Sequence, residues 1–190
     1  MNDKPVAAGK SSFDLIDTEK AFALMALMPG SKFLDLACGI GRYSMEVARK
    51  IGEKGTVYAV DLWCEGIEAL EREIDHRRIK NITTICADMR RNLPFADNSI
   101  DACLVATILH DLATEDRRAT VREINRLLRP GGMLHVIEFK KIEKGPGPPV
   151  TIRMDEGDVE TLVTQYGFTK IAGSEVGEFN YMVKYQKASL

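Results

Sequence analysis

The 190-residue chain lacks most of the features that mark membrane-spanning, secreted or nucleic-acid-binding proteins. No apolar run approaches the roughly 18 residues that cross a bilayer, and the first ten residues, MNDKPVAAGK, lack the apolar core of a signal peptide. The net charge of -2 and the pI near 6.0 give no excess of positive charge for nucleic acid or an anionic membrane. We therefore expect a cytoplasmic protein with no membrane span, no nucleic-acid partner and a small, neutral or weakly polar ligand.

Cysteine is scarce and scattered. The four cysteines, Cys38, Cys64, Cys86 and Cys103, lie far apart, and the sequence contains no CxxC pair. Three of them fall in or beside stretches that we expect to form buried strands. This arrangement favours reduced core thiols over a disulfide framework or a zinc site, so we expect no bound metal.

The sequence is organised around one stretch, KFLDLACGIGRYS, which spans 32–44. Its short apolar run ends at Gly39 and Gly41, and apolar residues then recur at helical spacing. The pattern predicts a buried strand, a glycine turn and a helix. Glycines at such a junction let a ligand approach the backbone, where the free N–H groups at the helix start attract electron-rich groups.

Acidic residues end the next two predicted strands. Asp61 follows the strand 56–60, about twenty residues beyond the glycines, where an acid can bind both hydroxyls of an adenosine ribose. Asp88 ends a third strand, over 82–87. Together with Asp35 on the first strand, three successive strand ends carry a carboxylate.

These motifs resemble those of class I S-adenosylmethionine-dependent methyltransferases, in particular the methyltransferase type 11 group that includes quinone C-methylases. The matching segments are LDLACGIG, VYAVD, CADM, IDACLVATILHDL and LLRPGGMLHVIEF, and the resemblance covers about 33–186. One departure is Ala37, where the pattern often has a first glycine. Alanine is small enough to keep the turn open.

The length favours a single domain, 1–190, with an N-terminal helical segment over 1–31 and a core over 32–190. The resemblance implies an α/β core, a Rossmann-like three-layer αβα sandwich of five βα units and a final hairpin. Its seven-stranded sheet would be mostly parallel with an antiparallel final strand, in the order 3-2-1-4-5-7-6. The implied cofactor is S-adenosylmethionine, and its expected binding residues are Asp35, Ala37, Gly39, Gly41, Asp61, Leu62, Asp88, Met89 and Ala106.

The implied reaction is methyl transfer to a small-molecule acceptor by in-line displacement, in a pocket at the carboxyl ends of strands 1, 4 and 5. His110 and Asp111 follow the fourth strand, over 100–107. If the acceptor must lose a proton, His110 is a candidate base that Asp111 orients or assists. His110 equally fits a structural role at a helix start, and for Asp111 we favour a capping role there over a catalytic one. Glu138, near the end of the fifth strand, is a second candidate for substrate contact.

Two other function classes share parts of this pattern. A non-catalytic S-adenosylmethionine-binding partner or sensor would keep the cofactor motifs and bind the cofactor without turnover. An NAD-dependent oxidoreductase would share the glycine turn and the ribose acid, but the third glycine of its fingerprint would fall at Ser44, and Asp88 would have no role. The acceptor stays open, as does a homodimer through an edge strand or the N-terminal segment.

Three further expectations concern packing. Trp63 fits the apolar stripe of the helix after the ribose acid, so we expect it in the core. Arg90 and Arg91 are interleaved with acidic residues in the sequence around them and are expected on a solvated face. The loop 140–150, rich in glycine and proline, is expected to wall the substrate pocket.

Overall fold

The computed structural model describes residues 8–189. Its strands are β1 (Lys32–Leu36), β2 (Thr56–Asp61), β3 (Ile82–Cys86), β4 (Ile100–Ala106), β5 (Leu128–Phe139), β6 (Phe168–Glu175) and β7 (Asn180–Lys187). Its α-helices are α1 (Thr18–Met25), α2 (Arg42–Ile51), α3 (Cys64–Arg77), α4 (Thr114–Leu127) and α5 (Glu156–Thr164). Three short 3-10 helices are η1 (Phe13–Leu15), η2 (Leu109–Asp111) and η3 (Val150–Ile152).

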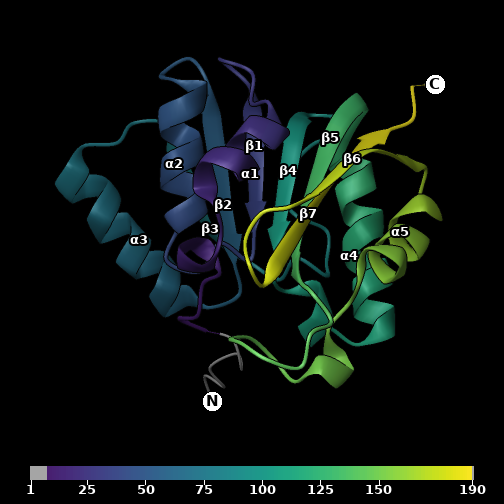
Figure 1. The fold of residues 1–190 in the computed structure, drawn as a ribbon. Helices are drawn as coiled ribbons and strands as arrows, with labels where there is room; N and C mark the ends of the chain where they lie inside the picture. The colour runs from purple at the N-terminus through teal and green to yellow at the C-terminus, as the bar shows by residue number, and fades with distance from the viewer. Residues whose placement is uncertain (1–7, 190) are drawn as a thin grey trace.

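The strands form one sheet in the order β3-β2-β1-β4-β5-β7-β6. Strands β1 to β5 are parallel to one another, whereas β7 runs antiparallel to both β5 and β6. Figure 1 shows the sheet between two groups of helices. The predicted fold class, the strand order and the antiparallel final strand are confirmed.

Both faces of the sheet are apolar because both are covered. On one face, Phe33 of β1 packs in a cluster with Val47 of α2 and residues of α1. On the other face, Leu34 of β1 packs with Ile124 of α4 and Val159 of α5. Successive residues of a strand point to opposite faces, so one short apolar run supplies both clusters.

The N-terminal segment reaches the sheet through α1. The Asp17 side chain caps this helix by accepting a hydrogen bond from the backbone N–H of Lys20 at 3.0 Å. Ala26 ends the helix in a left-handed conformation, with φ of 52°. The Lys184 ammonium of β7 donates to the carbonyl oxygen of Met25 at 3.2 Å and thereby ties the helix end to the sheet. The first seven residues of the predicted segment 1–31 lie outside the described residues.

The connection from β3 to β4, over 87–99, contains no helix, so the prediction of five βα units is wrong for this unit. Asn98 adopts a left-handed conformation there, with φ of 56°. Side chains of α4 hold the segment instead. The Glu123 carboxylate accepts the backbone N–H of Leu93 at 2.7 Å, and the Arg126 guanidinium donates to the Leu93 carbonyl at 3.1 Å.

The expectation of four reduced core cysteines is wrong for two of them. Cys64, the first residue of α3, and Cys86, the last of β3, form a disulfide with a Cα–Cα distance of 5.3 Å. They lie 22 residues apart in sequence, but β2 and β3 are parallel neighbours whose ends pair Asp61 with Cys86. Cys38 and Cys103 are free and buried.

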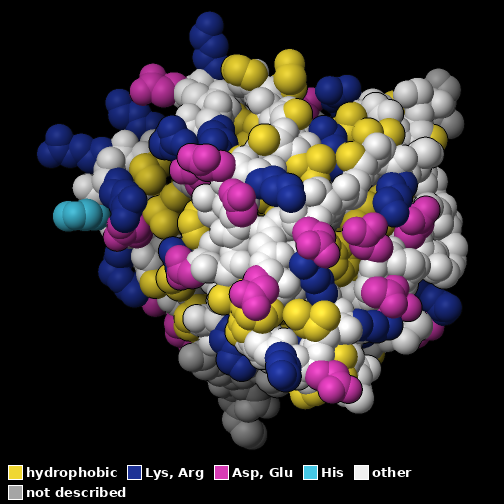
Figure 2. Space-filling model, in the orientation of Figure 1, with side chains coloured by type: hydrophobic (Ala, Val, Ile, Leu, Met, Phe, Trp, Pro, Cys, Tyr) yellow, Lys and Arg dark blue, Asp and Glu magenta, His cyan; other side chains and the backbone are white. Residues whose placement is uncertain are grey.

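The surface carries charges of both signs. Acidic and basic side chains are interspersed over the face shown in Figure 2. Between residues 8 and 189, no helix is long and apolar enough to cross a membrane. Within the same range, no group of three or more His, Cys, Asp and Glu side chains could hold a metal ion.

The middle of β5 buries a histidine. His135 has no exposed surface, and neither of its ring nitrogens has a hydrogen-bond partner in the described part of the chain. Its ring is stacked with that of Phe33, with the centroids 6.4 Å apart. Burial, with a smaller contribution from the positive charge of Lys184, lowers the pKa of His135 to about 3. The imidazole is therefore neutral in the folded protein near neutral pH.

We expect acid to destabilise the fold through His135. The ordinary histidine pKa is 6.5 and the folded value is about 3, so below pH 6.5 the unfolded chain binds the additional proton and stability falls as the pH falls. The slope approaches roughly 1.4 kcal/mol per pH unit. His135→Leu removes this contribution, so its stability relative to the wild type should increase from pH 7 to pH 5, as urea unfolding measures. The exposed His76→Gln is the control, and a constant difference between His135→Leu and wild type would contradict the assignment.

Candidate cofactor-binding site

A cleft of about 260 Å³ lies at the carboxyl ends of β1 to β4. Residues 8–12, the first that the structure describes, line one side of this cleft. Figure 1 shows this segment below the sheet. The strand order reverses between β1 and β4, which is where open α/β sheets bind ligands. Among the predicted site residues, those that line this cleft are Ala37, Gly39, Asp61, Leu62, Asp88, Met89, Ala106 and Asp111.

Three of the predicted cofactor-binding and catalytic residues lie outside the lining of the cleft. Asp35 is buried behind the glycine turn, where its carboxylate accepts a hydrogen bond from the Ser44 hydroxyl at 2.5 Å. Burial raises the pKa of Asp35 to about 7, although the bond from Ser44 opposes this shift. Gly41 is the N-cap of α2, and a Cβ at this position would clash with the Leu70 side chain. His110 lines a neighbouring cleft.

The glycine turn presents open backbone to the cleft. Gly39 has a φ of +56°, and, apart from its two chain neighbours, no residue of the described chain would lie within 4 Å of a Cβ placed on it. A ligand can therefore approach this backbone closely. Ala37 also has a left-handed φ, of 58°, which explains why the family pattern often has glycine at this position.

Asp61, at the end of β2, connects the two loops that flank the cleft. Its Oδ2 accepts the backbone N–H of Gly39 at 2.7 Å, and its Oδ1 accepts that of Trp63 at 2.7 Å. Each carboxylate oxygen keeps a second lone pair. Two oxygens fixed in this way match the two neighbouring hydroxyls of a ribose, which supports the role predicted for Asp61.

Asp88, after β3, is held by an arginine. Arg90 donates through Nε to Oδ1 at 2.7 Å and through Nη2 to Oδ2 at 2.8 Å, and it also contacts Asp116. The hydrogen bond from Arg90 lowers the pKa of Asp88, so the carboxylate is charged at neutral pH. The expectation of a solvated Arg90 is wrong because its side chain is half-buried against Asp88, whereas Arg91 is exposed.

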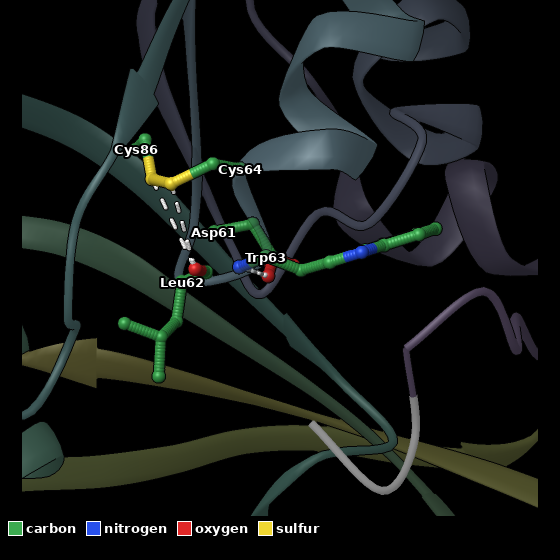
Figure 3. Close-up of a disulfide and its surroundings, with 5 residues drawn as sticks. All are labelled: Asp61, Leu62, Trp63, Cys64 and Cys86. Atoms are coloured by element: carbon green, nitrogen blue, oxygen red, sulfur yellow. Dashed lines mark hydrogen bonds between the residues drawn. A yellow bond between two sulfur atoms is a disulfide. The ribbon is translucent and has the colours of Figure 1, made fainter. Parts of the chain in front are cut away.

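Trp63 lines the cleft, so the expectation that it packs in the core is wrong. It precedes α3 as the N-cap residue, with extended backbone. Its ring lies over Gly66, where a Cβ would clash with the indole. Figure 3 shows the Leu62 and Trp63 side chains diverging from the loop that follows Asp61. The prediction was wrong because the apolar spacing of α3 extends back to Trp63, although Trp63 is the N-cap and lies outside the helix.

A polar cluster in the cleft wall was not predicted from the sequence. The Ser12 hydroxyl lies 2.9 Å from that of Tyr43 and 3.2 Å from that of Thr107, and all three residues line the cleft. Thr107 has a φ of 51°, which is unusual for a β-branched residue and typical of functional sites. The three come from distant parts of the sequence, so no spacing could reveal the cluster.

His110 lies in a second, more open cleft that shares Asp111 and Leu112 with the first. Its Nδ1 is 2.6 Å from Oε2 of Glu138, and its backbone N–H donates to Oε1 at 3.3 Å. Its Nε2 is 3.6 Å from Oδ1 of Asp111. Glu138 is fully buried, so the structure brings it to His110 and away from any open surface.

The charge state of His110 follows from these neighbours. Burial alone would lower the pKa of His110, but the hydrogen bond and charge of Glu138, with a contribution from Asp111, raise it above its ordinary value of 6.5. At neutral pH a substantial fraction of the imidazole is therefore protonated. The neutral form, which can accept a proton, increases as the pH rises.

The loop 140–150 does not line the cofactor cleft, and of its residues only Lys141 lines the second cleft. Arg153 is buried and fixes this loop by donating to four of its carbonyl groups. The acceptors are those of Lys140, Ile142, Pro146 and Pro148, at 2.9 to 3.1 Å.

Comparison with known proteins identifies the family. Residues 33–132 match the methyltransferase domain family, so the chain belongs to it. The chain is similar to the 2-phytyl-1,4-naphtoquinone methyltransferase of Nostoc punctiforme, with 34% identity over 124 residues, 65% of this chain and 53% of that protein. It is also similar to a ubiquinone/menaquinone biosynthesis C-methyltransferase of Shewanella sp., with 34% identity over 113 residues, 60% of this chain and 44% of that protein. The chain thus spans about half the length of the curated relatives it matches.

The fold has a close match among solved structures. A SAM dependent methyltransferase from Aquifex aeolicus gives a TM-score of 0.84 at 27% identity, with 93% of each chain covered. The predicted class, S-adenosylmethionine-dependent methyltransferases, and the predicted cofactor are therefore confirmed. The open backbone at Gly39 and the fixed carboxylate of Asp61 fit this cofactor.

We expect Asp61→Ala to weaken the binding of S-adenosylhomocysteine. The change removes the acceptors for two hydroxyl groups, and charge-assisted hydrogen bonds contribute about 1.5 to 3 kcal/mol each. Isothermal titration calorimetry should show a dissociation constant at least roughly tenfold higher. Asp75→Ala, which removes an exposed carboxylate from α3, is the matched control. Equal affinity in Asp61→Ala and wild type would contradict the ribose assignment.

We expect Ala37→Gly to stabilise the fold. A left-handed conformation costs alanine about 1 to 2 kcal/mol, and the greater freedom of glycine in the unfolded chain offsets about half of this. Chemical denaturation should show a net gain of roughly 0.5 to 1 kcal/mol. Ala48→Gly, at a position inside α2, should have the opposite effect. A loss of stability in Ala37→Gly would show that this φ causes no strain.

Proposed function

We propose that this protein transfers a methyl group from S-adenosylmethionine to a small-molecule acceptor. The observation that carries the proposal is the Asp61 carboxylate, held by Gly39 and Trp63 at the edge of an open glycine turn. The bound cofactor supplies a methyl group already activated by a sulfonium. The protein therefore has to align the acceptor with that methyl group in a pocket that excludes water.

We assign the cofactor and the acceptor to two adjoining clefts. The first is lined by seven of the nine residues predicted for the cofactor, and the second adjoins it at Asp111 and Leu112. The second cleft also contains apolar side chains from Ile152 and Leu162. Most of its lining is polar, with Arg117, Arg118 and Lys141 among the charged side chains, so an acceptor that carries oxygen substituents on an apolar body fits it. The two relatives named as quinone methyltransferases support a quinone-like acceptor.

We propose His110 as the base for an acceptor that must lose a proton. The Glu138 carboxylate holds Nδ1 as the donor nitrogen, which leaves Nε2 as the atom that accepts a proton. Nε2 lies 3.6 Å from Asp111, whose side chain borders both clefts. Asp111 stabilises the imidazolium that forms, and Glu138 orients the ring.

A non-catalytic S-adenosylmethionine-binding protein is the second candidate. The observation that favours it is the burial of His110, which is only 6% exposed and is fully engaged by Glu138. In that case the pair would stabilise the end of β5, and the protein would bind cofactor without turning over an acceptor.

Turnover measurements distinguish the two candidates. The protein is incubated with S-adenosylmethionine labelled in the methyl group and a panel of reduced naphthoquinones, phenols and thiols, and labelled product is quantified. We expect transfer to a reduced quinone. Binding of S-adenosylhomocysteine without transfer to any member of the panel would favour the non-catalytic protein.

The pH dependence tests the role of His110. Because Glu138 raises the pKa of His110 above 6.5 and the neutral imidazole is the base, the rate should rise with pH through an apparent pKa above 6.5. Glu138→Gln removes the carboxylate charge, so we expect the profile to move to lower pH and the maximal rate to fall. Glu175→Gln, at an exposed carboxylate of β6, is the control. Identical profiles for Glu138→Gln and wild type would contradict this role.

A further inference from the structure

The disulfide connects the first residue of α3 with the last residue of β3, close to both predicted cofactor acids. Cys64 directly follows Trp63 and lies three residues after Asp61, and Cys86 precedes Asp88 by two residues. Figure 3 shows the bond beside the loop that contains Asp61, Leu62 and Trp63. Both sulfur atoms lie 3.9 Å from the carbonyl oxygen of Leu62. The bond therefore fixes one wall of the cofactor cleft to the next.

The two cysteines of the bond differ from the other two in access. Cys64 and Cys86 are exposed, and neither lines the cofactor cleft, so a thiol can reach the bond whether or not the cleft is filled. Cys38 and Cys103 are buried, and burial raises the pKa of both thiols well above the ordinary value. Thiol–disulfide exchange requires an accessible thiolate, so it is restricted to the exposed pair.

Loss of the bond would loosen the loops without opening the sheet. The β2–β3 ladder continues to the pair Asp61 and Cys86, and the Ala87 N–H donates to the Asp61 carbonyl at 2.9 Å. These backbone contacts hold the strand ends together in either state. Beyond them, Leu62 and Trp63 on one side and Asp88 on the other lose their covalent connection.

We propose that Cys64 and Cys86 are a reversible thiol–disulfide exchange site, and that its oxidised form favours binding of the cofactor. The inference rests on the proposed function of the cleft. Formation of the bond releases two protons and two electrons from the two thiols. A small disulfide such as oxidised glutathione accepts the electrons through a mixed disulfide and leaves as two thiols. Reduction reverses each step.

The expected effect is moderate because the bond orders the cleft and does not touch the ligand. Ordering a loop residue or side chain before binding improves affinity by about two- to tenfold. Binding is also linked to oxidation, so the cofactor product should favour the disulfide over the dithiol by the same factor. A bond with a merely structural role, remote from the cleft, would show no such reciprocity.

The experiment compares oxidised and reduced wild type with Cys64→Ser/Cys86→Ser. We expect titration with S-adenosylhomocysteine to give a dissociation constant about two- to tenfold higher after reduction. The double variant should have the dissociation constant of the reduced wild type, and adding a reductant should not change it. Cys103→Ala, which removes a buried thiol, should keep the redox response. The protein is also equilibrated in glutathione buffers with and without S-adenosylhomocysteine. The ligand should raise the equilibrium constant for forming the disulfide by the same factor as oxidation lowers the dissociation constant.

The outcomes separate this inference from the function of the cleft. Tight binding that is equal in the oxidised and reduced wild type would overturn the exchange site and leave the cofactor assignment intact. A wild type that stays a dithiol in oxidised glutathione would also overturn the exchange site. Failure of every form to bind S-adenosylhomocysteine would instead overturn the proposed function, and the inference with it.

Discussion

The site depends on one carboxylate, that of Asp61, and on the two backbone N–H groups that hold it. Parallel strands β1 and β2 bring the glycine turn and Asp61 to the same edge, and the bonds to Gly39 and Trp63 fix both oxygens at 2.7 Å. The carboxylate thus stabilises the turn while its remaining lone pairs face the cleft. Gly39 adds no side chain beside this position, and the space that a Cβ there would occupy is open. The acceptor that we propose for the ribose therefore lies in the connection between two strands.

Two further charged pairs extend this arrangement along the sheet edge. Arg90 orients Asp88 beyond β3, and Glu138 of β5 orients His110 beyond β4. In each pair, a neighbouring side chain holds a group at the end of a strand. The sequence alone did not indicate either pairing. Burial strengthens the second pair because little water competes for the Glu138 carboxylate. The cleft that we assign to the cofactor and the one that we assign to the acceptor thus have separate ion pairs, and the two clefts share Asp111 and Leu112.

The sequence predicted those features that depend on local pattern. Apolar runs ending in glycine or aspartate indicated the strands and their carboxyl ends, and the family resemblance then supplied their order. Features that depend on contacts between distant segments were not predictable. Cys64 pairs with Cys86 only because β2 and β3 end side by side, and Ser12 meets Thr107 across the cleft. Trp63 was misplaced because a helical stripe does not reveal where the helix begins.

The central claim is that the cleft binds S-adenosylmethionine and its product. The most direct test measures the midpoint of thermal unfolding in separate samples with S-adenosylhomocysteine, with NAD and with NADP. A ligand at a hundred times its dissociation constant stabilises the folded state by about 2.7 kcal/mol. For a domain of this size, this should raise the unfolding midpoint by roughly 5 to 10 °C. We expect this shift with S-adenosylhomocysteine alone; a shift with NAD and none with S-adenosylhomocysteine would contradict the account.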